Sequence, residues 1–478
     1  MEGNLRSKVI SGLAWKFGER ILAQLVSIVV SIVLARLLMP EDYGAVALVM
    51  TFITIANVFV VNGFGSALIQ KKDATDTDFS TVFYINLVFS FIIYFVLFLI
   101  APLFAHFYNL PVLEPATRVL ALRIPIAAVN SIQQAYVSKN MLFKRFFFST
   151  LFGTAISGVV GIWMAYLGYG VWALVAQYLT NVCVDTIVLW VTVKWHPIRA
   201  FSFISAKELI IYGWKLLAAG LLDTGYNELR TLLIGKVYSS YDLAYYNQGD
   251  KYPKIIVINI NSAISSVLFP VLSTMQEEKA RVKYLTRKSI QVSSYVMWPM
   301  MLGLAVIAEP LVKLLLTEKW ISCVPYLCIF CISYGMWPIH TANLEALKAI
   351  GRSDLFLKLE ITKKIIGLIA LIISLQWGPI AIAVSLIVSG IIAVFVNGKP
   401  NTELLEYSFK EQILDLLHPF LIAVLMAALI YPLRMIVHSD VALIIASIVY
   451  GALVYALLSM IFKPEGFVYL RLLLLKNN

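Results

Sequence analysis

Long runs of apolar residues alternate with short polar segments along almost the whole chain. About 20 helical residues cross the ~30 Å hydrocarbon layer of a membrane. This pattern predicts an all-α polytopic membrane protein with about 14 transmembrane helices. The predicted spans are residues 12–36, 43–69, 79–105, 113–138, 146–167, 170–193, 208–235, 243–273, 289–316, 324–350, 359–377, 379–397, 416–437 and 440–462.

Composition excludes the soluble classes of protein. Of the 478 residues, 60% are hydrophobic and only 14% are charged, and the mean hydropathy is +0.84. Soluble domains are nearer 45–50% apolar and about 25% charged. The chain is therefore neither a soluble enzyme nor a disordered or disulfide-built protein. Because its charges are dispersed among apolar residues, no broad basic face for nucleic acid is expected.

The net charge of +11 mainly reflects topology. If the 14 spans are threaded through a membrane, one set of alternating connections holds 23 Lys and Arg residues. The opposite set holds only Arg36, Lys236, Lys313, Lys319 and Arg434. Cytoplasmic loops of membrane proteins are the ones enriched in Lys and Arg. Both termini are therefore predicted to be cytoplasmic.

No sequence feature indicates catalysis. The longest polar stretches, near 194–207 and 398–415, are too short for a soluble catalytic domain. The chain has no GxSxG, P-loop or HExxH motif, and no GxGxxG between a strand and a helix. The chain has four cysteines, Cys183, Cys323, Cys328 and Cys331. Because their neighbours in the sequence are apolar, we interpret them as packing residues rather than metal ligands. We expect a non-enzyme with no catalytic residue, no metal and no cofactor.

Two parts of the chain are similar to each other. Trp15-Lys16 recurs as Trp214-Lys215, and Asp42 corresponds to Asp242. Six spans separate the copies, so both enter the membrane in the same direction, which predicts a parallel repeat with a site between its halves. The predicted organisation is two pseudo-symmetric six-helix lobes, residues 1–200 and 201–400. Two further transmembrane helices and a short cytoplasmic tail follow in residues 401–478.

Polar residues inside the predicted spans are the candidate site, because ionisable groups in a membrane are costly and usually line a cavity. Basic side chains there attract phosphate or carboxylate. The candidates for binding an anionic cargo are Arg20, Gln24, Arg123, Lys215, Arg230, Lys251 and Lys254. The candidates for binding a coupling ion, Na⁺ or a proton, are Asp223, Glu228, Asp250 and Glu345. As an alternative, Asp223, Glu228 and Arg230 form a purely structural ion-pair group; His340 is interpreted as a packing residue.

Three segments carry a resemblance to a known family: GLAWKFGERILAQLVSIVVSIVLARLLMPEDYGAVAL at the N-terminus, NGFGSALIQKKD at the end of the second span, and LEALKAIGRSDLFLK after the tenth. With them the chain resembles the polysaccharide-transport branch of the multidrug/oligosaccharidyl-lipid/polysaccharide (MOP) flippase superfamily. More narrowly, it is similar to Wzx-type and teichuronic or colanic acid exporters. The family has no strict catalytic motif, so no residue transfers as an established site. A MOP/MATE-like fold and a cationic central cavity are implied.

The resemblance also implies a function. It indicates a flippase that moves undecaprenyl-diphosphate-linked oligosaccharide across the bacterial cytoplasmic (inner) membrane by alternating access, for cell-surface polysaccharide biosynthesis. Expected partners are this lipid-linked oligosaccharide, membrane lipid, and polysaccharide polymerase with its chain-length machinery. The alternatives are an ion-coupled small-molecule exporter of the multidrug type and, less favoured because the loops are short, an integral membrane glycosyltransferase or ligase.

Overall fold

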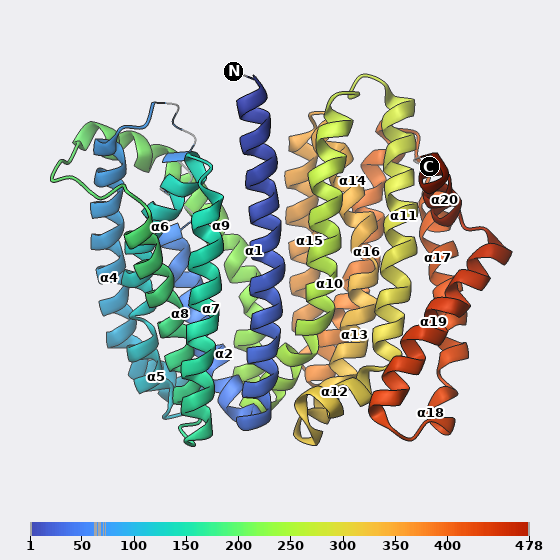
Figure 1. Ribbon diagram of the computed structural model, residues 1–478, viewed down its shortest axis with the longest axis horizontal. Helices are drawn as coiled ribbons and strands as arrows, with labels where there is room; N and C mark the ends of the chain where they lie inside the picture. The colour runs from blue at the N-terminus through green and yellow to red at the C-terminus, as the bar shows by residue number, and fades with distance from the viewer. Residues whose placement is uncertain (1, 62–64, 66–67, 70, 72, 477–478) are drawn as a thin grey trace. The chain divides into compact units, whose positions relative to one another are not determined.

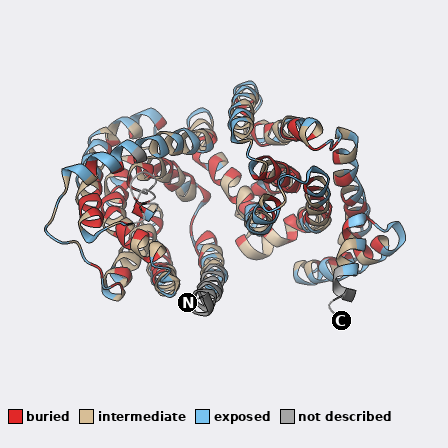
Figure 2. Cartoon of the chain, turned by 90° about the horizontal axis from the view of Figure 1, so that it is seen from above, coloured by how far each residue is buried: buried red, intermediate tan, exposed pale blue. Residues whose placement is uncertain are grey.

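The computed structural model describes residues 2–61, 65, 68–69, 71 and 73–476, and gives no side chains for 2–17, 19–20, 61, 212 and 473–476. All the regular secondary structure of the described residues is helical (Figure 1). Its contacts divide the chain into two compact units, Met1–Ala244 and Tyr245–Asn478. In both units buried residues lie where helices face one another, and exposed apolar residues lie on outward faces (Figure 2).

The first unit contains eight described helices and the start of a ninth. They are α1 (Glu2–Leu37), α2 (Pro40–Val61), α4 (Asp76–Tyr108), α5 (Leu113–Leu120), α6 (Arg123–Lys139), α7 (Phe143–Tyr166), α8 (Val171–Thr192) and α9 (Phe203–Val237), followed by the first turn of α10 (Ser240–Ser273).

The second unit contains the rest of α10 and the remaining helices. They are α11 (Lys279–Val306), α12 (Ala308–Leu316), the 3₁₀ helix η1 (Glu318–Cys323), α13 (Val324–Gly335), α14 (Trp337–Ala349), α15 (Ser353–Ser374), α16 (Pro379–Leu404), α17 (Phe409–Ile430), α18 (Leu433–Ile436), α19 (Asp440–Phe462) and α20 (Glu465–Lys476).

Each predicted span is largely helical in the described residues; residues 62–64 and 66–67 of the predicted span 43–69 lie outside them. Ten of the described helical segments are long and apolar enough to cross a membrane. The other four predicted spans correspond to α1, the α5–α6 pair, α9 and α15, which are helical but are not among these ten segments. The protein is therefore an all-helical polytopic protein with ten clear spans, and the count of 14 stays a prediction.

Proline explains why three predicted spans are each broken into two helices. Pro125, Pro310 and Pro338 lie in the first turns of α6, α12 and α14. Proline has no backbone N–H to donate, so it fits the first turn of a helix, where that N–H has no partner. These three prolines therefore begin a new helix rather than interrupt one. Pro102, Pro253, Pro270 and Pro299 do lie inside helices.

The two segments predicted to be repeats start their helices in similar ways. Asp42 accepts a hydrogen bond from the backbone N–H of Met39 at the start of α2. Asp242 accepts one from the hydroxyl of Ser239 at the start of α10. The contacts place α9 in the first unit, beside α2 and α4. The predicted six-helix lobes were defined by sequence repetition, whereas the two units are defined by contacts. The lobes therefore stay a prediction.

Small residues let α7 approach its neighbours closely. Ser149, Gly153, Ser157, Gly161 and Ala165 recur every four residues along α7, and all of them are buried. A Cβ atom added at Gly161 would lie 2.9 Å from Cβ of Gln177 on α8. Close approach through small residues replaces the hydrophobic driving force, which is weak between helices in lipid. This ridge therefore sets the separation of α7 and α8.

Gly44, in the Asp-Tyr-Gly segment of α2, faces the backbone of Ser240 at the start of α10. A Cβ atom at position 44 would lie 2.9 Å from Cα of Ser240 and closer still to its carbonyl group. Backbone atoms cannot rotate away as a flexible side chain can, so overpacking here must displace a helix end. The two residues belong to the same unit.

We therefore expect Gly44→Ala to destabilise the first unit by about 2 kcal/mol, the usual cost of overpacking. Thermal unfolding of the purified protein, followed by size-exclusion chromatography, measures the effect. Gly225→Ala on α9 is the matched control, because no other described part of the chain, apart from the neighbouring backbone of α9 itself, lies within 4 Å of a Cβ there. Equal melting of the two variants would contradict the assignment of a close contact at Gly44.

Candidate functional site

Helix α9 carries four of the predicted site residues. Lys215 and Asp223 are exposed, and Glu228 is half-buried. Asp223 accepts a hydrogen bond from the Asn227 amide over 3.2 Å, and Glu228 accepts one from the Thr51 hydroxyl of α2 over 2.9 Å. The structure thus uses Glu228 to join α9 to α2.

Arg230 is the buried cation of α9. The residue is 8% exposed, and its guanidinium lies over the ring of Tyr226, 5.7 Å from the ring centre. Among the described residues, no hydrogen-bond acceptor faces its Nε atom. Burial of a charged group away from water is costly unless it is paired. The Nε atom of Arg230 is therefore a buried donor without a partner among the described residues.

Arg123, at the start of α6, also lies among uncharged groups. Its guanidinium contacts the sulfur of Met50 at 3.6 Å and lies 5.8 Å from the ring centre of Tyr178. Arg123 and Arg230 thus supply two positively charged groups within the first unit. The other two candidates of this unit are on α1: Gln24 is half-buried, and the side chain of Arg20 lies outside the described residues.

In the second unit, polar residues of α10 and α13 contact one another. The Lys254 ammonium lies 2.9 Å from one oxygen of Asp250 and forms an ion pair with it. The Tyr334 hydroxyl donates a hydrogen bond to the other oxygen. Lys251, the next residue after Asp250, is half-buried. The structure brings Asp250 and Lys254 together as a neutralised pair.

Glu345 and His340, both on α14, are engaged in local contacts. Glu345 is buried and forms an ion pair with Lys348, with 3.2 Å between nitrogen and oxygen. The Nδ1 atom of His340 lies 3.2 Å from the side-chain amide nitrogen of Asn397 on α16. Of the four acidic candidates, Asp250 and Glu345 are therefore paired with a lysine of their own helix, whereas Asp223 and Glu228 accept hydrogen bonds from uncharged side chains.

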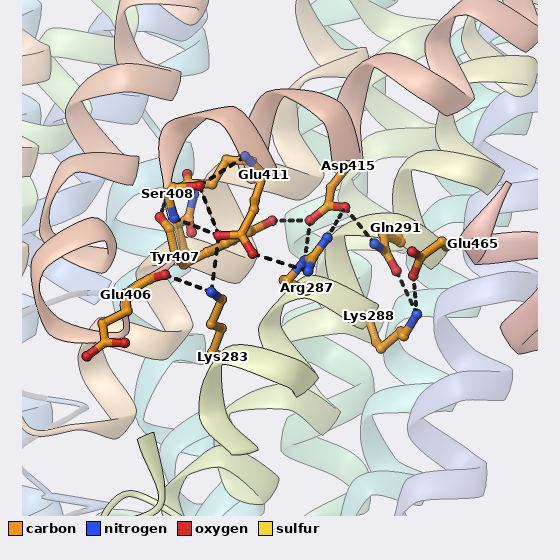
Figure 3. A network of polar contacts seen from close by, with 12 residues as sticks. Lys283, Arg287, Lys288, Gln291, Glu406, Tyr407, Ser408, Glu411, Asp415 and Glu465 are labelled. Carbon is orange, nitrogen blue, oxygen red and sulfur yellow. Dashed lines mark hydrogen bonds and ion pairs between the residues drawn. The ribbon is translucent and has the colours of Figure 1, made fainter. Parts of the chain in front are cut away.

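Sequence reasoning missed a polar network that joins α11, α17 and α20 (Figure 3). Asp415 of α17 accepts two hydrogen bonds from the Arg287 guanidinium, at 2.7 and 2.9 Å. It accepts two more, from the Gln291 amide at 2.6 Å and from the Tyr407 hydroxyl at 2.7 Å. Four donors on one carboxylate make it the centre of this network, which we name the Asp415 clamp.

Flanking ion pairs extend the Asp415 clamp to its neighbours. Lys283 pairs with Glu411 at 3.1 Å on one side, and Lys288 pairs with Glu465 of α20 at 2.5 Å on the other. The Lys288 ammonium lowers the pKa of Glu465 from its usual range. A cavity of about 380 Å³ lies beside the clamp, lined in part by Arg287, Asp415 and Glu465. Because cations and carboxylates alternate here, the arrangement suits helix anchoring better than anion binding.

Metal-site geometry is absent from the part of the chain that the structure describes, where no group of three or more His, Cys, Asp or Glu side chains converges. All four cysteines are free: Cys323 and Cys331 are buried, and Cys183 and Cys328 are half-buried.

Comparison with known proteins gives a consistent result. Residues 33–325 match the family described as "Polysaccharide biosynthesis protein". The chain is 24% identical over 360 residues to the teichuronic acid biosynthesis protein TuaB of Bacillus subtilis, covering 74% of this chain and 73% of that protein. It is also 24% identical over 451 residues to the lipopolysaccharide biosynthesis protein WzxC of Escherichia coli, covering 92% and 90%.

Solved structures show the same fold. The lipid II flippase MurJ in an inward closed conformation matches with a TM-score of 0.75 and 17% identity, covering 95% of this chain and 99% of that one. An inward-facing multidrug resistance transporter of the MATE family and MOP superfamily matches with a TM-score of 0.64 and 16% identity, covering 81% and 96%. The predicted MOP/MATE-like fold is confirmed.

The Asp415 clamp gives a stability prediction. Asp415→Ala leaves Arg287, 30% exposed at its side chain, without its main partner, and should cost about 3 kcal/mol, the scale for breaking a buried pair. The unfolding temperature of the purified protein should fall by several degrees. Asp354→Ala, which removes an exposed carboxylate paired with Arg352, is the control and should leave that temperature unchanged. Identical melting of the two variants would show that the clamp does not hold α17 to α11.

Proposed function

The chain belongs to the polysaccharide biosynthesis protein family, and from this premise we propose that it moves a lipid-linked oligosaccharide across the bacterial cytoplasmic membrane. It is a Wzx-like membrane transporter of the MOP superfamily and not an enzyme. The proposed cargo is an undecaprenyl-diphosphate-linked repeat unit. It is carried from the cytoplasmic to the outer leaflet for the assembly of a cell-surface polysaccharide.

One observation carries the proposed cargo: Arg230 is a buried arginine whose Nε has no hydrogen-bond acceptor among the described residues. A guanidinium binds phosphate through two parallel hydrogen bonds, and this planar recognition favours arginine over lysine. A diphosphate would supply a hydrogen-bond acceptor for Nε and a negative charge to balance the positive charge of Arg230. Arg123, among uncharged groups in the same unit, adds a second positive charge.

The proposed membrane topology has 14 spans, with both termini in the cytoplasm. It adds α1, the α5–α6 pair, α9 and α15 to the ten clear spans. The excess of Lys and Arg in alternate connections supports this orientation. The proposed repeat consists of residues 1–200 and 201–400, followed by two further helices.

The proposed mechanism is alternating access. The basic residues bind the diphosphate from the cytoplasmic side while the polyprenyl chain stays in the bilayer, since apolar chains gain nothing by leaving it. A change of conformation then exposes the bound glycan to the opposite side. An ion gradient, or consumption of the product by polymerase and chain-length machinery, gives the cycle its direction.

A complementation assay tests the cargo site. In a bacterium deleted for this gene, Arg230→Ala should reduce surface polysaccharide about tenfold or more, since a hydrogen bond to a charged group contributes about 1.5–3 kcal/mol. Arg230→Lys keeps the charge but not the planar fork, so we expect partial export. Arg281→Ala is the control, because Arg281 is exposed and pairs only with the neighbouring Glu278 among the described residues.

Surface polysaccharide and accumulated lipid-linked precursor are both measured in this assay. If the Arg230→Ala variant, present at the normal protein level, exports as much polysaccharide as the wild type, the proposed role of Arg230 is wrong. A deletion strain with normal polysaccharide but increased drug sensitivity would instead favour a small-molecule exporter.

A further inference from the structure

A cavity of about 310 Å³ lies at the end of α19, where the chain turns into α20. It belongs to the second unit and is separate from the residues proposed to bind cargo. Its lining combines two cations with four apolar side chains and includes no acidic residue. The lining residues are Met460, Lys463, Phe467, Val468, Arg471 and Leu472.

The end of α19 places this cavity at the edge of the hydrocarbon layer. The helix is one of the ten clear spans, and it ends at Phe462. Its last residues are apolar and face outward: Met460, Ile461 and Phe462 are 58, 69 and 48% exposed. Lys463 follows directly. Basic side chains at the ends of membrane helices reach the layer in which the lipid phosphates lie. The cavity therefore opens at the level of the lipid headgroups.

Neither cation of the cavity is neutralised by the described part of the chain. Lys463 and Arg471 are exposed, and no ion pair or side-chain hydrogen bond joins either of them to a described residue. The acidic residue nearest to Lys463 in the sequence is Glu465, which pairs instead with Lys288 of α11. Two such cations beside apolar walls attract a ligand with a negatively charged head and an apolar body.

The backbone at Lys463 is a second sign of a ligand outside the chain. Its φ of 46° and ψ of 54° lie in the left-handed region. Glycine is the usual residue at this position after a helix, because a Cβ atom is disfavoured there. Lysine therefore costs stability at position 463, and its ammonium group gains no described partner in return. A contact with a molecule outside the chain explains why a long basic side chain stands here.

Helix α20 forms a fixed wall of the cavity because it packs on α11 (Figure 1). A Cβ atom at Gly466 would lie 2.6 Å from the backbone oxygen of Gln291, so the two backbones are in close contact. The ring of Phe467 lies 6.1 Å from that of Tyr295, centre to centre. Val468, Arg471 and Leu472 follow at helical spacing on the outward side. The cavity is thus preformed, which lowers the entropic cost of binding.

We propose that this cavity binds the headgroup of one acidic phospholipid, with phosphatidylglycerol as the model ligand. Lys463 and Arg471 bind the phosphate, Arg471 through its planar guanidinium, while Phe467 and Leu472 contact the glycerol and the upper acyl chains. The volume is at the low end of the range for ligand pockets, about 300–1,000 Å³, and suits one headgroup rather than an oligosaccharide. The apolar walls favour a lipid over free phosphate. The proposal does not depend on the proposed cargo.

Native mass spectrometry of the full-length protein in detergent counts bound lipids and measures their dissociation constants. The probes are phosphatidylglycerol, phosphatidylcholine with the same acyl chains, and inorganic phosphate as a competitor. The double variant Lys463→Gln/Arg471→Gln removes both charges from the cavity. The control Lys358→Gln/Lys410→Gln removes the same charge from two exposed lysines of α15 and α17. The variant Lys463→Arg/Arg471→Lys exchanges the two cations and keeps the charge.

We expect the wild type and the control to bind one phosphatidylglycerol about tenfold or more tightly than phosphatidylcholine, because each basic residue near the membrane surface attracts anionic lipid. Lys463→Gln/Arg471→Gln should lose this preference, and the variant with exchanged cations should keep most of it. Equal preference in Lys463→Gln/Arg471→Gln and the wild type would overturn the proposal, as would an equal loss in the control. Displacement of the lipid by an equal concentration of inorganic phosphate would instead indicate a site for free anions and contradict the lipid assignment.

Discussion

A polar group that enters the hydrocarbon of a membrane must find its partner inside the protein, and this constraint shapes both units. The second unit shows one way in which it is met. Asn343, Asn401 and Gln412, from α14, α16 and α17, are fully buried and hydrogen-bond to one another at 2.8 to 3.1 Å. Beside them, Asp415 accepts four hydrogen bonds. The helices that follow α16 are thus held by polar contacts as much as by apolar packing.

In both units some buried polar atoms lack a partner among the described residues, and two of those in the first unit lie on helices of the candidate site. Arg230 has a buried nitrogen without an acceptor, and Asn130 has a buried oxygen without a donor, both among the described residues. The nitrogen can donate a hydrogen bond to an acceptor, and the oxygen can accept one from a donor. A transporter must bind and release its ligands, so groups that are satisfied only when a ligand is present suit it better than groups satisfied permanently by the protein.

Helix packing in the first unit depends on residues that contribute almost no side chain. The ridge of small residues on α7 brings its backbone close to α8, where Gln177, Asn181 and Asp185 follow one another at helical spacing. Between α2 and α10, Gly44 does the same against a backbone carbonyl. Closely packed backbones hold polar side chains in place without a large buried apolar surface. Such a surface would add little, because the hydrophobic driving force between helices is weak in lipid. Close packing and polar side chains therefore share the same helix faces here.

The sequence by itself determined the class of protein and the place of nearly every helix, because hydropathy is a local property that adds up residue by residue. It also identified Arg230, Arg123 and Asp250 as polar residues within helices. It did not reveal which polar groups meet. Arg287 and Asp415 are 128 residues apart, and Asn130 and Asp185 are 55 apart. Their meeting depends on the rotation and spacing of whole helices, and helices that are apolar on all sides carry little information about rotation. Only the tertiary structure could therefore show that Asp250 already has its lysine, that Asp415 is a clamp, and that the Asn130 amide meets Asp185.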